Sequence, residues 1–125
     1  LKGGKMQYKP SLPIYQQVEM DIIKDMLNGK LPPGSKMPSG RELALVYKIN
    51  PNTAQRVYQE LEHKGLCYTK RGMGTFVTEE EERLKTERIH LAKEYSREFL
   101  QRMKDLSVSK EQLREYLEEE LDASS

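Results

Sequence analysis

Two short helices that follow one another almost without a break constrain this chain more than any other feature of its sequence. The second is predicted to run from Asn50 to Gly65, because asparagine is favoured at a helix N-cap, proline is tolerated at the first helical position, and glycine commonly closes a helix. Its apolar residues recur at helical spacing. They predict one buried stripe, formed by Ala54, Val57, Tyr58 and Leu61.

The first helix begins at a capping box. Ser39 supplies a hydroxyl for the N-cap and Glu42 stands three residues later, so each side chain can bond the other residue's backbone. The helix is expected to end near Lys48, within a turn of residues 47–49. Two short helices joined by such a turn are typical of a helix-turn-helix, in which the second helix enters the major groove of DNA. The residues predicted to face inward are Leu43, Ala44 and Val46.

The polar side of the second helix carries the first functional hypothesis. Its front end displays side chains that hydrogen-bond readily to base edges and phosphates, which favours a DNA recognition helix. Taken alone, the segment would better fit an ordinary amphipathic surface helix. The residues assigned to a DNA contact here are Asn50, Asn52, Thr53, Gln55 and Arg56.

After the second helix the pattern becomes strand-like. Two stretches rich in β-forming residues, 66–70 and 75–78, flank a glycine-containing turn, which predicts a β-hairpin. A basic tip on such a wing can reach a phosphate or the neighbouring minor groove, and glycines let its backbone approach closely. The alternative is a plain solvent-exposed hairpin with two incidental cations. The tip residues predicted to contact DNA are Lys70, Arg71, Gly72 and Gly74.

A further helix is expected upstream, from Pro13 to about Asn28, followed by a rigid turn over residues 30–37 that contains two prolines and a glycine. Residues 1–12 are interpreted as a tag remnant with an extended lead-in, because prolines disfavour helix in the residues before them. The predicted buried face of the helix comprises Ile14, Val18, Ile22, Ile23, Met26 and Leu27.

The last part of the chain, residues 79–125, is predicted to form two helices. Four acids at 79–82 complement the dipole of a helix that reaches about Lys104, and a second capping box at 109–112 opens the last helix. Their sparse apolar seam has little to pack against, which predicts an isologous dimer interface. The alternative is that the tail folds back on its own domain. The interface residues are Leu84, Leu91, Tyr95, Phe99, Met103, Leu113, Tyr116 and Leu117.

Charge is distributed unevenly along the chain. Residues 1–78 contain 12 Lys or Arg and 6 Asp or Glu, a net charge of +6, whereas residues 79–125 contain 9 and 14, a net charge of −5. The contrast suggests that the first part meets a polyanion and the second does not, although chance scatter of solvated charges would also produce it. A winged module that binds a protein without specific DNA readout is the alternative hypothesis. The positive charge and the polar front of the helix argue against that module.

Little in the sequence supports an enzyme, a metal site or a cofactor. His63 and His90 stand on separate helical segments without a Cys or carboxylate at ligand spacing, and Cys67 falls in a predicted strand, where a small buried side chain is expected. The single cysteine excludes an internal disulfide and fits a reducing cytoplasm. No apolar run approaches the ~20 residues of a membrane span. The expected partners are double-stranded DNA and a second copy of the chain, and a small-molecule effector is left open.

Several of these motifs together resemble the GntR family of bacterial transcription regulators. They are Pro-Ser-Gly-Arg-Glu-Leu-Ala at 38–44, the second helix, and Leu-Glu-His-Lys-Gly-Leu at 61–66 followed by Arg-Gly-Met-Gly-Thr-Phe-Val at 71–77. Asn-Pro-Asn-Thr at 50–53 and Tyr-Gln-Glu-Leu-Glu at 58–62 are similar to the YtrA subfamily, whose short two-helix tail serves dimerisation. The length of this chain agrees with such a tail.

The resemblance also implies roles for single residues. Ser39 and Arg41 lie in the family motif whose arginine contacts DNA. Many relatives carry arginine in place of Pro51 and Gln55, so a guanine-rich operator is not implied, and Gln55 would pair more naturally with adenine. The residues whose positions face DNA in relatives are Asn52, Thr53 and Arg56.

The sequence therefore predicts a mainly α-helical chain with a β-hairpin wing. A winged helix-turn-helix is expected over residues 13–78 and a two-helix C-terminal dimerisation tail over residues 79–125. The expected function is that of a sequence-specific DNA-binding transcription regulator, by resemblance a repressor, that binds a palindromic operator as a homodimer. Because subfamily members often sit with transporter genes, the resemblance makes a transporter operon a candidate target.

Overall fold

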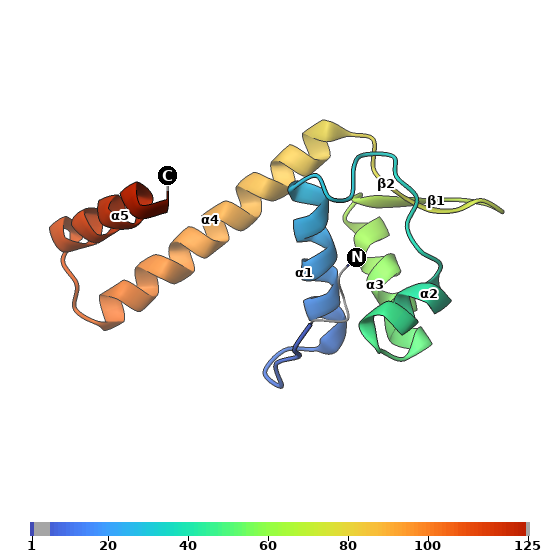
Figure 1. Ribbon diagram of the computed structural model, residues 1–125, viewed down its shortest axis with the longest axis horizontal. Coiled ribbons are helices and arrows are strands. Elements are labelled where there is room, and N and C mark those ends of the chain that lie inside the picture. The colour runs from blue at the N-terminus through green and yellow to red at the C-terminus, as the bar shows by residue number, and fades with distance from the viewer. Residues whose placement is uncertain (2–5, 125) are drawn as a thin grey trace. The chain divides into compact units, whose positions relative to one another are not determined.

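The computed structural model describes residues 1 and 6–124 and divides the chain into two compact units, Leu1–Glu87 and Arg88–Ser125 (Figure 1). Most of the predicted tag remnant lies outside the described residues. The mainly helical fold with a hairpin wing is confirmed. Its elements are α1 (Ile14–Leu27), α2 (Gly40–Tyr47), α3 (Pro51–His63), β1 (Cys67–Lys70), β2 (Gly74–Val77), α4 (Glu81–Asp105) and α5 (Lys110–Ser124).

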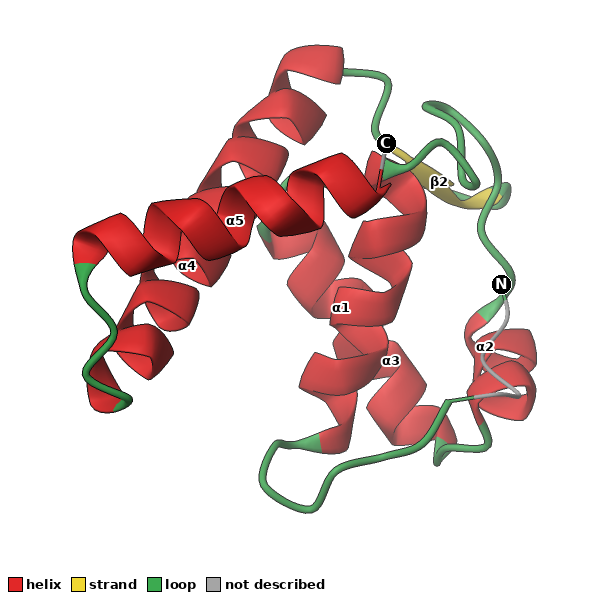
Figure 2. Cartoon of the chain, turned by 60° about the vertical axis from the view of Figure 1, so that its left-hand side comes forward, coloured by secondary structure: helices red, strands yellow, loops and turns green. Residues whose placement is uncertain are grey.

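Helices α1 and α3 lie side by side and supply half of the buried apolar residues of the first unit (Figure 2). The predicted stripe of α3 is confirmed, because all four of its residues are at most 5% exposed. On α1 the prediction is wrong for Ile14, which is 46% exposed because it lies in the first turn, at the free end of the helix, and Leu27 is half-buried. Glu19 is buried instead, and its carboxylate pairs with the Lys64 ammonium beyond the end of α3. That pairing offsets the cost of removing a charge from water.

Helix α2 starts at the predicted capping box and ends at Tyr47, beside the predicted end near Lys48. Tyr47, predicted to lie in the turn, is the last residue of the helix and is 1% exposed. Its hydroxyl donates to Asp21 Oδ2 of α1 at 2.6 Å, which satisfies a polar group that would otherwise be buried without a partner. The turn itself is made by Lys48, whose φ of +54° places it in the left-handed region.

The hairpin pairs β1 with β2 in antiparallel register, with Cys67 opposite Val77 and Lys70 opposite Gly74. The loop before α2, predicted only as a rigid turn, also pairs with β2. Gly34 N–H donates to the Val77 carbonyl at 2.9 Å, and Met37 N–H donates to the Thr75 carbonyl at 2.8 Å. Strand β2 is therefore bonded on both edges, which fixes the base of the wing against the start of α2.

The second unit contains the larger part of α4 and all of α5, and the chain turns back between them (Figure 1). Ser107 makes the turn with a φ of +58°, and Val108 N–H donates to the Met103 carbonyl at 3.2 Å, as in a Schellman motif. The predicted second capping box is confirmed, since Ser109 and Gln112 bond each other's backbone N–H groups at 3.0 and 3.1 Å. Among the described residues, none of the helices combines the length and the apolar character that a membrane crossing requires.

Candidate nucleic-acid interface

The start of α2 is held by three side chains. The Tyr58 hydroxyl of α3 donates to the Pro38 carbonyl, directly before the capping box. Glu42 N–H donates to Ser39 Oγ at 3.1 Å and Ser39 N–H donates to Glu42 Oε1 at 3.0 Å. These bonds hold the pKa of the Glu42 carboxyl below its usual range, and the bond from the Ser39 backbone N–H has the largest effect. Arg41 stands exposed in the first turn that they fix.

The front end of α3 is capped by one of its own candidate residues. Asn50 Oδ1 accepts from Asn52 N–H at 2.8 Å, so the Asn50 side chain closes the helix as well as lying at the predicted interface. Asn52 is exposed and Thr53 is half-buried. The side chains beyond them, Gln55 and Arg56, are both exposed.

Gln55 and Arg56 lie against different neighbours although they are adjacent in sequence. Gln55 Oε1 lies 3.8 Å from the position that a Cβ would occupy on Gly40, at the start of α2. Arg56 instead lies over the Tyr15 ring at the start of α1, with Cζ 3.9 Å from the ring centre. Helix α3 thus presents one polar side chain toward α2 and the next toward α1.

A hollow of about 570 Å³ lies between the start of α2, the exposed side of α3 and the wing. Gln55 and Gln59 line it from α3. Two carboxylates also line it, but both accept hydrogen bonds: Glu42 within the capping box and Glu62 from the Thr69 hydroxyl of β1. The hollow is therefore lined mainly by groups that can donate or accept hydrogen bonds, as a surface that meets base edges or ordered water requires.

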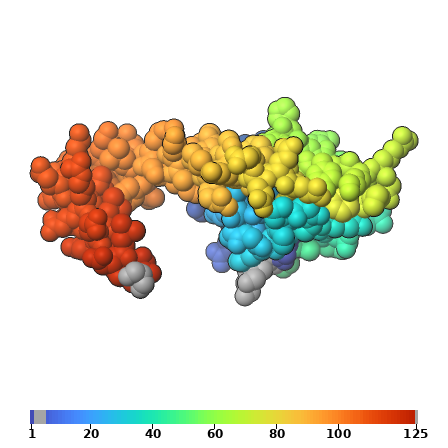
Figure 3. Space-filling view, turned by 90° about the horizontal axis from the view of Figure 1, so that it is seen from above, coloured from blue at the N-terminus to red at the C-terminus, as the bar shows by residue number. Residues whose placement is uncertain are grey.

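The wing carries its predicted cations in two different settings. Lys70 Nζ lies 5.2 Å from the Phe76 ring centre and 5.8 Å from the Tyr68 ring centre, above a stacked aromatic pair. Arg71 is exposed at the tip, which projects from the first unit at the right of Figure 3. Gly72 has a φ of +78° and Gly74 a φ of +114°, and a Cβ on Gly74 would lie 3.1 Å from the Lys36 side chain. Both positions therefore favour glycine.

The predicted contacts from α2, α3 and the wing all belong to the first unit, and their role in DNA binding stays a prediction. Sequence reasoning missed Tyr15, which the structure brings to Arg56 across 41 residues of sequence. Periodicity along α1 offers no signal for this contact, because a half-buried tyrosine at a helix start has many structural uses.

The residues assigned to the dimer interface differ in exposure. Leu84 and Leu91 are 6% and 7% exposed in the single chain, whereas Tyr95 and Phe99 are 45% and 40% exposed. Met103 and Leu113 are half-buried, and Tyr116 and Leu117 are exposed. A surface for a partner is therefore available mainly from Tyr95 onward.

Metal-ligating residues do not cluster in the described part of the chain. Within it, no group of three His, Cys, Asp or Glu could hold a metal ion. Cys67 is buried as predicted, and burial raises the pKa of its thiol to about 12, which disfavours the reactive thiolate.

Comparison with known proteins supplies an independent test. The model of the family described as "Bacterial regulatory proteins, gntR family" matches residues 14–77. The uncharacterized HTH-type transcriptional regulator YhcF of Bacillus subtilis is 40% identical over 109 residues, which cover 87% of this chain and 90% of that protein. The HTH-type transcriptional repressor YtrA of the same organism is 35% identical over 112 residues, with coverage of 89% and 86%.

Solved structures extend the likeness to three dimensions. A GntR family transcriptional regulator from Listeria monocytogenes is similar with a TM-score of 0.84 and 34% identity, over 90% of this chain and 98% of that one. The DNA-binding domain of AraR, solved in complex with operator ORX1, is similar with a TM-score of 0.54 and 31% identity, over 58% of this chain and 93% of that one.

Proposed function

Because the chain belongs to the GntR family of bacterial regulatory proteins and is a sequence-specific DNA-binding transcription regulator, we propose that it is a repressor that binds a palindromic operator as a homodimer. The first unit is the DNA-binding unit: α3 enters the major groove, Arg41 at the start of α2 contacts a base edge, and the wing tip reaches the flanking groove. Cytoplasmic location and a transporter operon as target belong to the same proposal.

One observation supports the choice of the DNA-binding surface. The front of α3, the start of α2 and the wing tip all expose polar and basic side chains in the first unit, and all lie within residues 1–78, whose net charge is +6. Each phosphate that such a surface neutralises releases counterions, so binding should weaken as salt rises, with a slope of roughly −0.9 in log K against log salt per contact.

The homodimer rests on the second unit. Its exposed apolar side chains lie on α4, on α5 and in the turn between them, among them Phe99 at 40%, Leu106 at 72% and Leu117 at 40% exposure. An isologous interface that covers them would relate two first units by a two-fold axis, and the operator would then be palindromic. The repressor YtrA of Bacillus subtilis is a relative over most of its length, which supports repression as the sign of regulation.

Selection from a library of random duplexes tests the proposal and requires no assumption about the target sequence. We expect an enriched inverted repeat whose half-site centres lie about one helical turn, or a multiple of it, apart. Fluorescence anisotropy with the selected duplex and a scrambled one then measures discrimination. An enriched single half-site, or equal affinity for both duplexes, would contradict the proposal.

A variant pair makes the result specific to α3. The double change Asn52→Ala and Gln55→Ala should abolish the preference for the selected duplex while some affinity for the scrambled one persists. Arg114→Ala, on an exposed position of α5, is the control. Transcription in vitro from the selected duplex placed at a promoter should fall on addition of the protein, and a rise would reverse the assigned sign.

A further inference from the structure

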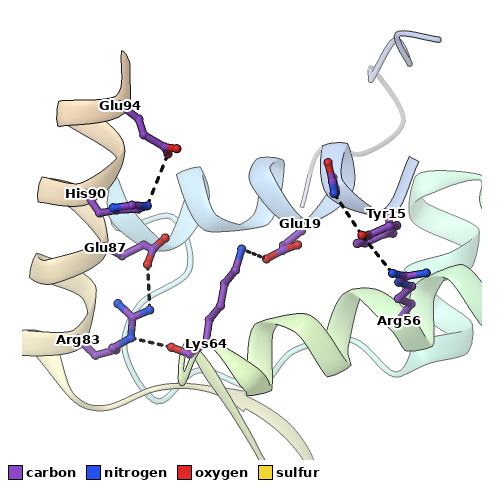
Figure 4. Close-up of polar contacts among 9 residues, drawn as sticks. Tyr15, Glu19, Arg56, Lys64, Arg83, Glu87, His90 and Glu94 are labelled. Atoms are coloured by element: carbon purple, nitrogen blue, oxygen red, sulfur yellow. Dashed lines mark hydrogen bonds and ion pairs between the residues drawn. The ribbon is translucent and has the colours of Figure 1, made fainter. Parts of the chain in front are cut away.

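Tyr15 and Arg56 join the start of α1 to α3 through both a hydrogen bond and a cation–π contact (Figure 4). The guanidinium of Arg56 lies over the ring of Tyr15, 3.9 Å from the ring centre, and Arg56 Nη2 donates to Tyr15 Oη at 3.2 Å. Gln16 Nε2 donates to the same hydroxyl oxygen, also at 3.2 Å. The start of α1 therefore holds a side chain of the recognition helix.

We propose that Tyr15 is a positioning residue, which fixes Arg56 as a phosphate contact at the α1 side of the groove that α3 enters. Base discrimination is then left to the neighbouring side chains of α3, Gln55 among them. This inference rests on the proposed function, since it specifies how one part of that DNA surface works.

The direction of Arg56 is the first reason. A helix in the major groove meets base edges along its centre and phosphates along its flanks. Gln55 lines the hollow shared with α2 and the wing, and Arg56 does not line it. Arg56 is turned to the α1 flank by its contact with Tyr15, which places its charge where a backbone strand would run.

The donors gathered at this flank are the second reason. Tyr15 Oη accepts hydrogen bonds from Gln16 Nε2 and Arg56 Nη2, so the tyrosine holds the guanidinium at this flank. Arg56 uses one of its five N–H donors on the tyrosine, which leaves the others for an oxyanion. Two carboxylates, Glu19 and Glu60, line a hollow with Tyr15, and Glu19 is paired with Lys64. The N–H donors that Arg56 does not use on the tyrosine are the chemistry that a phosphate needs.

Preorganisation is the physical effect of the stack. A free arginine samples many rotamers and loses that freedom when it binds, whereas a guanidinium held on an aromatic ring has already lost part of it. Removing the ring should therefore weaken binding through Arg56 alone and should leave the charge of the surface unchanged.

A double-mutant cycle tests this with four proteins: the wild type, Tyr15→Ala, Arg56→Ala and the double variant. Affinities are measured on the selected duplex and on a scrambled duplex over a range of salt. Arg56→Ala should weaken binding to both duplexes by the same factor, about tenfold, and reduce the salt slope by about 0.9 per subunit. Tyr15→Ala should weaken binding about threefold when Arg56 is present and by less than about twofold when it is absent.

Two further variants separate positioning from folding. Tyr15→Phe keeps the ring and should bind within about twofold of the wild type. Arg114→Ala removes the same charge from an exposed site on α5 and should leave affinity and salt slope unchanged. Thermal melting of every variant should agree within a few degrees, because Tyr15 is only half-buried.

The outcomes distinguish failure of this inference from failure of the proposed function. If the wild type prefers no duplex, the proposed function fails and the inference fails with it. If the wild type discriminates but the cycle is additive, only the positioning role of Tyr15 is overturned. A change in base preference on Arg56→Ala, or a loss with Tyr15→Phe as large as with Tyr15→Ala, would also overturn it.

Discussion

The two units of this chain use the same helical periodicity to opposite ends. In the first unit, the apolar stripe of α3 is almost wholly buried, with Val57 and Leu61 at 0% exposure. In the second unit, the apolar residues of α5 recur at similar spacing, yet none of the described residues of that helix is buried. A helix that buries its stripe within its own unit builds a core, whereas a helix that exposes it retains the means to bind another chain.

The largest effect is expected from a substitution in the second unit that leaves the first unit folded. Phe99→Asp places a charge on the exposed apolar seam and should convert a dimer into a monomer. Because two linked DNA-binding units bind far more tightly than one, operator affinity should fall on the order of a hundredfold or more. Analytical ultracentrifugation and fluorescence anisotropy measure the two losses.

Gln101→Glu is the matched control for that change. It adds one negative charge to the same helix, two residues away and so on a different face. The dimer and the affinity should both persist. An unchanged dimer with Phe99→Asp would show that the seam is wrongly placed.

The next largest effect is expected on the stability of the first unit. Leu61→Ala, at a fully buried position of α3, should lower the free energy of unfolding by about 2–5 kcal/mol. Leu117→Ala makes the same change in the second unit, at a position 40% exposed, and in the Phe99→Asp background it should cost less than about 1 kcal/mol. Denaturant unfolding compares the two, and equal losses would remove the contrast between the units.

Cys67 reports on the first unit alone. Burial raises the pKa of its thiol from the ordinary value of 9.0 to about 12, so the folded chain favours the protonated form. The resulting stability is fully present below about pH 9 and is lost as pH rises toward about 12, because between these values the unfolded chain ionises more readily than the folded one. At about pH 8, alkylation should be slow in the wild type and in Phe99→Asp and faster in Leu61→Ala.

A smaller effect is expected on DNA affinity when the exposed Arg41 of the first unit is replaced. Arg41→Ala should cost about 1–3 kcal/mol of binding on the operator if the arginine makes a bidentate base contact. The loss should then be larger on the operator than on a scrambled duplex. An equal loss on both would assign Arg41 to a phosphate, and Arg114→Ala again controls for charge.

The smallest effect concerns the wing tip. Arg71→Ala should weaken binding only a few-fold and reduce the salt slope by about 0.9 per subunit, because an exposed cation at a hairpin tip contributes mainly through counterion release. Measurement of affinity at several salt concentrations checks this. An unaltered slope would remove Arg71 from the interface.

Local chemistry made much of the fold predictable. Both capping boxes, the start of α3 at Asn50 and the buried stripe of α3 follow from residues within one or two turns of each other. The hairpin was predictable for the same reason, because strand-forming residues flank a turn with glycines. Motifs in a characteristic order also made the family recognisable.

Contacts between distant residues were not predictable in this way. The pairing of residues 34–37 with β2, the burial of Glu19 against Lys64 and the bond from Tyr47 to Asp21 each join segments far apart in sequence. Each depends on which surfaces meet, which a local pattern does not encode. The functional division of the chain at residues 78 and 79 likewise stays a prediction, while the compact units divide within α4.

The sequence by itself determined which segments are helices and where they begin, because caps and turns act over a few residues. It also determined that a basic segment, residues 1–78, precedes an acidic one, residues 79–125. Only the tertiary structure decided where the polar side chains of α3 point. Gln55 turns to α2 and Arg56 to Tyr15, since the direction of a long side chain is set by whatever packs beside it in space.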